Sequence, residues 1–364
     1  MEAHARQGKP SKDEPTPAER DHGPWPVVGH AWAVELLRHA LAPGGPGPGH
    51  AYLLSGPPQI GKTTLAQALA RALLCREGGP DPCGRCRSCR LMERDSHPDF
   101  RRIQPLDREG QPDPVQGLLR ADQASQIVRE ALLRPVEARY KVFLIQEMQR
   151  ANEAFANKLL KTLEEPPEHV VLCLTAHHRS RVLPTIASRC QHLELRPLDR
   201  ATVEQALQHR WGASPEQARL LARLCQGRLG WAVERLADPG ALETRREALA
   251  ELRQLARSGR IPRLVYAREL ATRSGGTPGL FEQLDLWASW WRDVMLAQAG
   301  YPDGCTHVDM LPAIQEDAAA FHAAQVRRYL ALLGQVKDHL HRAANVHLAL
   351  DVLLLQMPRP VNLE

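Results

Sequence analysis

Apolar residues in the first half of the chain form short runs separated by stretches of helical periodicity. The runs at 51–54, 141–145 and 170–174 are continuously apolar, which is typical of strands buried on both faces of a parallel sheet. Residues 97–103 are a further candidate strand, and residues such as 65–74 repeat apolar positions at helical spacing. This alternation predicts an α/β domain with helices on both sides of a mostly parallel sheet.

The second half of the chain carries helical patterns only. Residues 200–237 show short helical periods broken by glycines and prolines, and longer amphipathic patterns follow at 281–299 and 326–357. We therefore expect an all-helical second half, with a small bundle followed by a larger one. Helical spacing favours core or subunit packing over base stacking for three tryptophans, Trp287, Trp290 and Trp291.

The pattern predicts four parts of the chain. Residues 1–24 mix charges with Pro, Gly and Ala, and they are expected to be a disordered tail. Residues 25–196 form the predicted α/β domain. Residues 197–240 form the small helical domain, and residues 241–364 form the larger one.

A phosphate-binding sequence lies between the first apolar run and the first helix. Residues 56–63 read G-x-x-x-x-G-K-T, and in this strand–loop–helix context backbone N–H groups and the helix N-terminus face a phosphate. Lys62 is expected to reach the outer phosphates, and the Thr63 hydroxyl to contact Mg²⁺. The alternative is a glycine-rich turn that happens to carry a lysine. The predicted residues that bind ATP or ADP are Gly56, Pro57, Pro58, Gln59, Ile60, Gly61, Lys62, Thr63 and Thr64.

Four cysteines begin where that helix ends. Cys83, Cys86 and Cys89 form two overlapping C-x-x-C steps, and Cys75 supplies a fourth thiolate. The spacing lets the sulfurs converge on one tetrahedral ion and leaves no position for water, so it predicts a structural Zn²⁺ site. The alternatives are disulfides or inert thiols. Disulfides are disfavoured because the sequence shows no signal peptide and a nucleotide site indicates a reducing cytosol.

Composition places few further limits on function. A chain of 364 residues, 43% hydrophobic and 24% charged, is long enough for two or three domains with ordinary cores. Its formal net charge of +5 permits contact with nucleic acid without arguing for it. No apolar stretch approaches the length of a membrane span, so we expect a cytoplasmic protein with no membrane partner.

Two further motifs point to a family. Residues 157–167 read N-K-L-L-K-T-L-E-E-P-P, an amphipathic helix stopped by two prolines, and Ser188-Arg189-Cys190 follows the run at 170–174. Taken in order with the phosphate loop and the cysteines, these motifs resemble the AAA+ clamp-loader subunits of bacterial DNA polymerase III. The resemblance covers residues 25–190 motif by motif, and it extends to the C-terminus only as a matching helical layout.

The resemblance implies an AAA+ P-loop domain with a zinc module at 75–89, a small helical lid and a C-terminal helical collar. It also implies a five-subunit ring with gamma/tau and delta subunits, which loads the sliding clamp onto primed DNA. In that ring Arg189 resembles the arginine finger that reaches a neighbour's nucleotide. An arginine supplied in trans can raise turnover by roughly 10³–10⁵. The alternative for Arg189 is a surface or salt-bridging residue at a turn.

Two departures from the family pattern bear on hydrolysis. Members that hydrolyse ATP place an acidic pair after the run at 141–145, whereas this chain has Gln146-Glu147. A neutral amide cannot replace a carboxylate beside a hard divalent cation, which counts against Mg²⁺. Hydrolysing members also carry a lid arginine near Gly230. Arg228 lies two positions earlier, and Thr175 offers a hydroxyl at the sensor strand.

A phosphate loop and a finger, without the acidic residue and the lid arginine, resemble the delta-prime branch of that family. Its members donate an arginine to gamma/tau and hydrolyse little or no ATP themselves. One alternative is a gamma/tau-type ATPase motor, which steady-state ATPase of the isolated chain would reveal. A second is a zinc-containing DNA-binding module with the phosphate loop as scaffold, which DNA affinity of the isolated chain would reveal.

Overall fold

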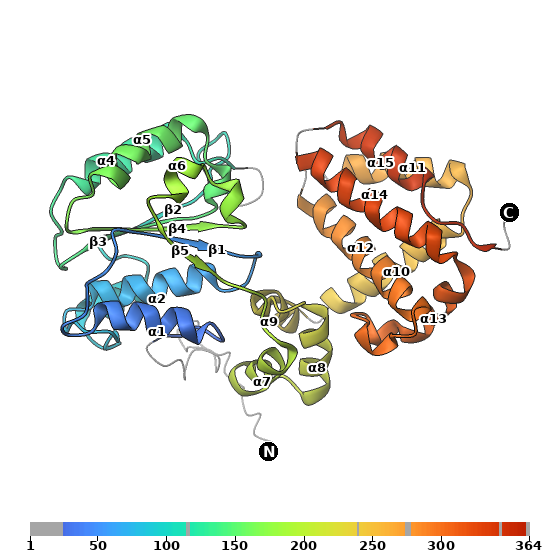
Figure 1. Cartoon of the computed structure of the whole chain (residues 1–364), viewed down its shortest axis with the longest axis horizontal. Coiled ribbons are helices and arrows are strands. Elements are labelled where there is room, and N and C mark those ends of the chain that lie inside the picture. Colours follow the sequence, from blue (N-terminus) through green and yellow to red (C-terminus); the bar gives the residue numbers. More distant parts are fainter. Residues whose placement is uncertain (1–24, 114–116, 239, 274–277, 342–343, 362–364) are drawn as a thin grey trace, which may run out of the picture.

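The computed structural model describes residues 25–113, 117–238, 240–273, 278–341 and 344–361. The tail at 1–24, for which the sequence predicts disorder, lies outside the described residues. Figure 1 shows an α/β half, a small helical group and a C-terminal helical half. No helix within the described ranges combines the length and the apolar character needed to cross a membrane.

The α/β half is built on a five-stranded parallel sheet. Its strands are β1 (Ala51–Ser55), β2 (Phe100–Ile103), β3 (Lys141–Ile145), β4 (Val170–Ala176) and β5 (Gln191–Glu194). They pair in the order β2-β3-β4-β1-β5, and each neighbouring pair is parallel. The sequence predicted the first four strands. It missed β5, whose sequence Gln-His-Leu-Glu offers a single apolar residue.

Helices cover both faces of this sheet, as the sequence predicts (Figure 1). In β1, Tyr52 and Leu54 pack into one hydrophobic cluster, while Ala51 and Leu53 pack into the cluster on the other face. This division follows from the two-residue period of a strand. The first face carries α1 (Ala31–Leu41) and α2 (Lys62–Leu74), with α3 (Arg87–Glu93) beside α2. The second carries α4 (Ala121–Ala131), α5 (Glu153–Glu164) and α6 (Pro184–Ala187), and short turns η2 (Met148–Arg150) and η3 (Arg179–Arg181) precede α5 and α6.

Three short helices follow the sheet and share a hydrophobic cluster of their own. They are α7 (Arg200–Trp211), α8 (Pro215–Leu224) and α9 (Leu229–Ala237). The Asp199 side chain caps α7, and Gly212 ends it in the left-handed conformation. Ser214 caps α8, with Pro215 in the first helical position. These local signals explain why the segment breaks into short helices.

The C-terminal half is all-helical, as predicted. Its helices are α10 (Ala241–Ala256), α11 (Arg260–Arg273), α12 (Pro278–Gln298), α13 (Leu311–Ala320), α14 (Ala323–His341) and α15 (Val346–Leu355), with short turns η4 (Pro302–Gly304) and η5 (Val308–Met310). The pattern expected as one stretch at 326–357 belongs to two helices, α14 and α15. The Asn345 side chain accepts a hydrogen bond from Leu348 N at 3.1 Å and starts the second helix.

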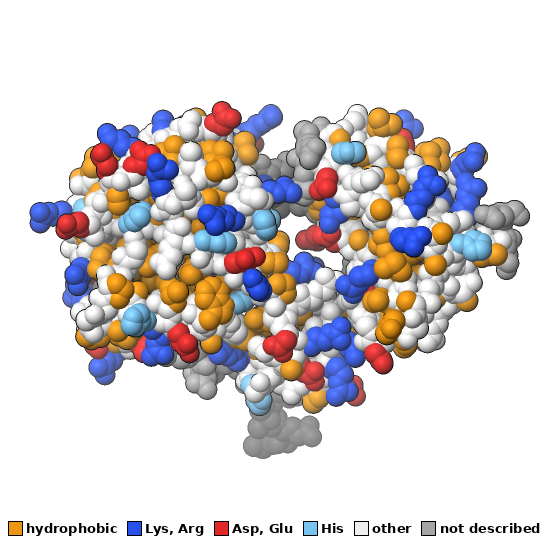
Figure 2. Space-filling model, in the orientation of Figure 1, with side chains coloured by type: hydrophobic (Ala, Val, Ile, Leu, Met, Phe, Trp, Pro, Cys, Tyr) orange, Lys and Arg blue, Asp and Glu red, His pale blue; other side chains and the backbone are white. Residues whose placement is uncertain are grey.

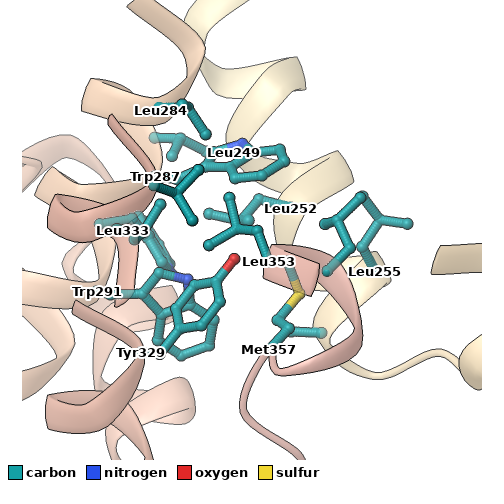
Figure 3. Packing of buried hydrophobic residues seen from close by; sticks show 14 of the residues in the cluster. Leu249, Leu252, Leu255, Leu284, Trp287, Trp291, Tyr329, Leu333, Leu353 and Met357 are labelled. Carbon is teal, nitrogen blue, oxygen red and sulfur yellow. The ribbon is translucent and has the colours of Figure 1, made fainter. Parts of the chain in front are cut away.

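Aromatic residues of α12 form the centre of the C-terminal core (Figure 3). Trp287, Trp290 and Trp291 are each at most 1% exposed. The Trp291 ring meets Phe321 edge-on at 5.1 Å and Tyr329 at 5.9 Å between ring centroids. The predicted role of the tryptophans in core packing is therefore confirmed, and none of the three is exposed for base stacking.

A buried arginine joins the two ends of this half. The Arg263 side chain on α11 is fully enclosed. It donates hydrogen bonds to Leu255 O at 3.1 Å and Ala256 O at 2.8 Å, at the end of α10. It also donates to Met357 O at 2.9 Å and Pro358 O at 3.2 Å, just after α15. Leu255 O also accepts from Ser258, whereas the guanidinium supplies the donors for the carbonyls of Ala256, Met357 and Pro358 at the two helix ends.

We expect Arg263→Met to lower the free energy of unfolding of the C-terminal half by about 3 kcal/mol or more, because several buried carbonyls lose their donor together. Urea unfolding followed by tryptophan fluorescence measures this, since α12 tryptophans report on that core. Arg268→Met, on an exposed position of the same helix, is the matched control and should change little. Equal stabilities of the two variants would contradict a structural role for Arg263.

Candidate functional site

The phosphate loop lies at the carboxyl end of β1, between β4 and β5 in the sheet. Lys62 begins α2, and the loop residues before it turn through left-handed backbone conformations at Gly56, Gln59 and Gly61. A Cβ at Gly56 would lie 2.3 Å from Leu195 O, so only glycine fits there. The structure therefore has the strand–loop–helix arrangement that the sequence predicts, with the helix N-terminus aimed at the loop.

The Lys62 side chain is folded against its own loop. Its ammonium donates hydrogen bonds to Gly56 O at 2.8 Å and Pro57 O at 2.7 Å, and the residue is 6% exposed. Burial lowers the pKa of Lys62 to about 8, against the opposing effect of the Glu147 carboxylate. A phosphate group at this loop would compete with two backbone carbonyls for the lysine.

Polar side chains from the neighbouring strand ends face the start of α2. Gln146, directly after β3, donates from Nε2 to Thr63 Oγ1 at 3.1 Å. Gln104, directly after β2, donates from Nε2 to Gln146 Oε1 at 2.7 Å. Sequence reasoning singled out Thr63 and Gln146 but missed Gln104. The position of Gln104 directly after a predicted strand could have identified it, because the carboxyl ends of parallel strands meet at one edge of the sheet.

The neighbouring carboxylate is held by other side chains. Glu147 Oε2 pairs with His177 Nε2 at 2.8 Å and also accepts a hydrogen bond from the Gln149 amide. Burial acts to raise the pKa of Glu147, but the hydrogen bond and charge of His177 lower it below its usual range. Thr175, expected at the sensor strand, accepts a hydrogen bond from Glu147 N at 3.1 Å. His177 was not identified from the sequence.

Helix α9 rests directly on the phosphate loop. Gly230 N donates to Gln59 O at 2.9 Å, and Gln59 Nε2 donates to Glu234 Oε2 at 2.5 Å. A Cβ at Gly230 would lie 2.8 Å from Gln59 O, which explains why this position holds glycine and not arginine. Arg228 also borders the cleft beside the loop, but its Nε donates to Cys225 O at 3.2 Å and its guanidinium lies over Trp231.

A large cleft opens beside the loop, between the α/β half and the C-terminal helices. It encloses about 2260 Å³, and Figure 2 shows the hollow between the two halves. The loop, Gln104, Gln146 and α9 line one side, and residues of α10 and α12 line the other. The predicted nucleotide-binding residues from Pro57 to Thr64 all border this cleft.

The four predicted cysteine ligands come together in space. Their sulfur atoms all lie within 4.8 Å of one another, and the described cysteines are free of disulfides. Cys75 and Cys89 are buried, while Cys83 and Cys86 are half-buried. Burial acts to raise the pKa of Cys86, but the backbone N–H of Cys89 and neighbouring groups lower it to about 6. Four convergent thiol groups can hold a metal ion.

Ion pairs and hydrogen bonds anchor the cysteine segment to the α/β half. Trp25 Nε1 donates to Asp81 Oδ1 at 3.0 Å, and Arg38 of α1 pairs with the same carboxylate at 2.5 Å. On the other side, Arg87 pairs with Glu137 at 3.0 Å. The segment is therefore held on both flanks as well as by the cysteines.

Arg189 lies apart from the phosphate loop of its own chain. It follows α6, which packs on the opposite face of the sheet from α2, and it does not border the cleft. Its guanidinium pairs with Glu164 Oε1 at 2.7 Å and donates to Thr185 O at 2.8 Å. The side chain remains 36% exposed. The structure thus brings together the loop residues and the cysteines, but not Arg189.

The phosphate loop after a central parallel strand, the strand order and the helices that follow define an AAA+ P-loop protein. Two family models match the chain. Residues 30–199 match "DNA polymerase III, delta subunit", and residues 239–358 match "DNA polymerase III, delta subunit, C terminal".

Curated relatives agree with these matches. The chain is 31% identical over 314 residues to the delta-prime subunit of DNA polymerase III from Pseudomonas aeruginosa, covering 84% of this chain and 91% of that protein. It is 29% identical over 316 residues to the Bacillus subtilis delta-prime subunit, covering 85% and 90%. The Escherichia coli tau subunit matches at 33% identity, but over 56% of this chain and 31% of tau. The chain belongs to the delta-prime subunit family of DNA polymerase III.

We expect Gly230→Ala to loosen α9 from the phosphate loop, because the added methyl group would contact the Gln59 carbonyl. Loss of a hydrogen bond worth about 1 kcal/mol predicts roughly fivefold faster amide exchange at residue 230. Hydrogen-exchange mass spectrometry of the α9 peptide measures this. Gly259→Ala is the matched control, since a Cβ there meets nothing within 4 Å. Unchanged exchange in Gly230→Ala would contradict the close contact.

Proposed function

We propose that the chain is the delta-prime subunit of a clamp loader that places the sliding clamp on primed DNA. The observation that carries this proposal is the delta-prime likeness, which runs through both halves and covers 84% of the chain in one relative. Clamp loading is the activity that the family resemblance implies. Its partners would be gamma/tau and delta subunits in a five-membered ring, with DNA contacted through the assembled complex.

We propose three functional parts for the described chain: an AAA+ domain at 25–196, a lid at 197–240 and a collar from residue 241 onward. The α/β half, the small helical group and the C-terminal half each have hydrophobic clusters of their own, which supports this division. The loop residues Gly56 to Thr64 would hold ATP or ADP at the cleft. Gln146 after β3 and Gly230 at the lid favour a subunit with little ATPase activity over the gamma/tau-type motor.

Arg189 would act as an arginine finger on the nucleotide of a neighbouring gamma/tau subunit. Three observations support this role. The guanidinium is partly exposed, it follows the helix on the face away from its own loop, and it borders no part of its own cleft. Its ion pair with Glu164 would then be exchanged for phosphate oxygens when the ring assembles.

Zn²⁺ would occupy the cysteine cluster as a structural ion. Four thiolates satisfy the tetrahedral preference of zinc and leave no position for a substrate or water. Cys75 directly follows α2 and Cys89 lies in α3. The ion would therefore stabilise the segment that connects these two helices. A catalytic role for this metal has no support in the donor set.

We expect Arg189→Ala to assemble with gamma/tau and delta subunits but to lower the ATPase rate of the complex. The fall should be on the order of 10³-fold or more at the site that Arg189 serves, because charge in the transition state loses its partner. Arg189→Lys should also fail, since an ammonium lacks the planar fork of a guanidinium. ATPase rates and clamp loading by the reconstituted complex measure both.

The matched control is Arg181→Ala, which removes an exposed arginine from the preceding turn η3. It should assemble and hydrolyse like the unaltered complex. A normal ATPase rate for the Arg189→Ala complex would contradict the arginine-finger role. Failure of the unaltered chain to assemble with gamma/tau and delta subunits would remove the proposed function as a whole.

We expect protein purified without added zinc to carry one Zn²⁺ per chain, because four preorganised thiolates bind this ion tightly. Cys86→Ser should lose it, and chelation should unfold the cysteine segment before the parallel sheet. Elemental analysis with circular dichroism measures both. Cys190→Ser, which changes a half-buried cysteine outside the cluster, should keep its zinc. Full zinc in Cys86→Ser would contradict the four-ligand site.

A further inference from the structure

The side chains of Thr63, Gln146 and Gln104 lie where P-loop proteins hold their magnesium ion. That ion is normally bound by the loop's Ser or Thr hydroxyl and by an acidic residue after a neighbouring strand. Here the hydroxyl is Thr63 and the residue after β3 is Gln146. Gln146 Nε2 donates to Thr63 Oγ1 at 3.1 Å, so the amide presents N–H groups, and not oxygen, toward the hydroxyl.

Gln104 maintains this orientation of the amide. Its Nε2 donates to Gln146 Oε1 at 2.7 Å, which occupies the oxygen that a metal ion would need. Gln104 is itself fixed at the end of β2, where its backbone carbonyl accepts a hydrogen bond from Gln123 Nε2 at 2.9 Å. Mg²⁺ demands oxygen ligands in near-octahedral geometry, and an N–H donor repels it. The residues at this position do not fit the ion that the fold family implies.

The nearby carboxylate does not compensate for the missing one. Glu147 Oε2 lies 2.8 Å from His177 Nε2, and the Gln149 amide also donates to it. Within the described ranges, the four cysteines are the sole group of three or more His, Cys, Asp or Glu side chains placed to share a metal ion. The Glu147 carboxylate at the loop is therefore already engaged by two side chains of the chain itself.

We propose that this phosphate loop binds a nucleoside di- or triphosphate without Mg²⁺, a step that rests on the nucleotide site of the proposed function. Lys62, the loop N–H groups and the N-terminus of α2 supply the positive potential for the phosphates. Because the Thr63 oxygen accepts from Gln146, its own O–H is left to donate to a phosphate oxygen. Gln104 and Gln146 thus convert a metal position into a neutral hydrogen-bonding position.

The test is calorimetric binding of ADP and of ATP to the full chain, with Mg²⁺ and then with EDTA in its place. We expect the affinity to be the same in the two buffers within about threefold. A loss of about tenfold or more when Mg²⁺ is removed would overturn the proposal. Absence of nucleotide binding in both buffers would overturn it too, while assembly with gamma/tau and delta would still support the proposed function.

Two variants test the residues that carry the proposal. Gln146→Asp restores a carboxylate, so its nucleotide affinity should fall by about tenfold or more in EDTA. In Gln104→Glu the new carboxylate can only accept hydrogen bonds. Gln146 should therefore turn its N–H toward that carboxylate and its oxygen toward Thr63, and nucleotide affinity should again depend on Mg²⁺. Gln126→Glu, on an exposed part of α4, adds a carboxylate elsewhere and should bind like the unaltered chain. Metal-independent binding in both site variants would overturn the roles of Gln104 and Gln146.

Discussion

Backbone hydrogen bonds from two neighbouring strands hold β1, and the position of the phosphate loop follows from them. β1 pairs with β4 on one side and β5 on the other, and all its residues are buried. The pairing continues past its end, where Gly56 N donates to Ala176 O at 3.2 Å and Leu195 N donates to Ser55 O at 2.7 Å. The loop therefore starts from a fixed point, and the strand ends that carry Gln104 and Gln146 are aligned with it.

The polar groups around the loop already have partners within the chain. Lys62 is bonded to backbone carbonyls, Thr63 to Gln146, and Glu147 to His177. P-loop enzymes that hydrolyse nucleotide hold Mg²⁺ with an acidic residue after a neighbouring strand, and here Gln146 follows β3. The arrangement fits a subunit whose proposed part in hydrolysis is played by Arg189 at a neighbour's nucleotide, and whose own loop serves for binding.

Features that depend on local sequence were predictable, and features that depend on tertiary contact were not. The buried strands, the phosphate loop and the convergence of the cysteines follow from runs and spacings, and the structure has all three. The break at Asn345 also had a local signal, a helix-capping residue that the periodicity obscured. By contrast, β5 exists because β1 has a free edge, and its own sequence is mostly polar.

The contacts that define the site lie between segments far apart in the chain. Gln104 and Gln146 come from different strands, and their hydrogen bond depends on the register of β2 against β3. The sequence shows that Gly230 stands where hydrolysing members of the family have an arginine. It does not show that the Gln59 carbonyl lies where a side chain at position 230 would begin. Comparing single residues with a family motif shows which side chains are absent. Only the tertiary packing shows which groups lie in their place.

The contact between Gln59 and Gly230 is also part of a connection from the phosphate loop to the C-terminal half. Helix α9 sits on the loop at that point, and Arg223 of the adjacent helix α8 donates to Asp303 O at 3.0 Å in the C-terminal half. The first bond is made by α9 and the second by α8. The small helical group therefore connects the phosphate loop to the C-terminal half through directed hydrogen bonds on both sides.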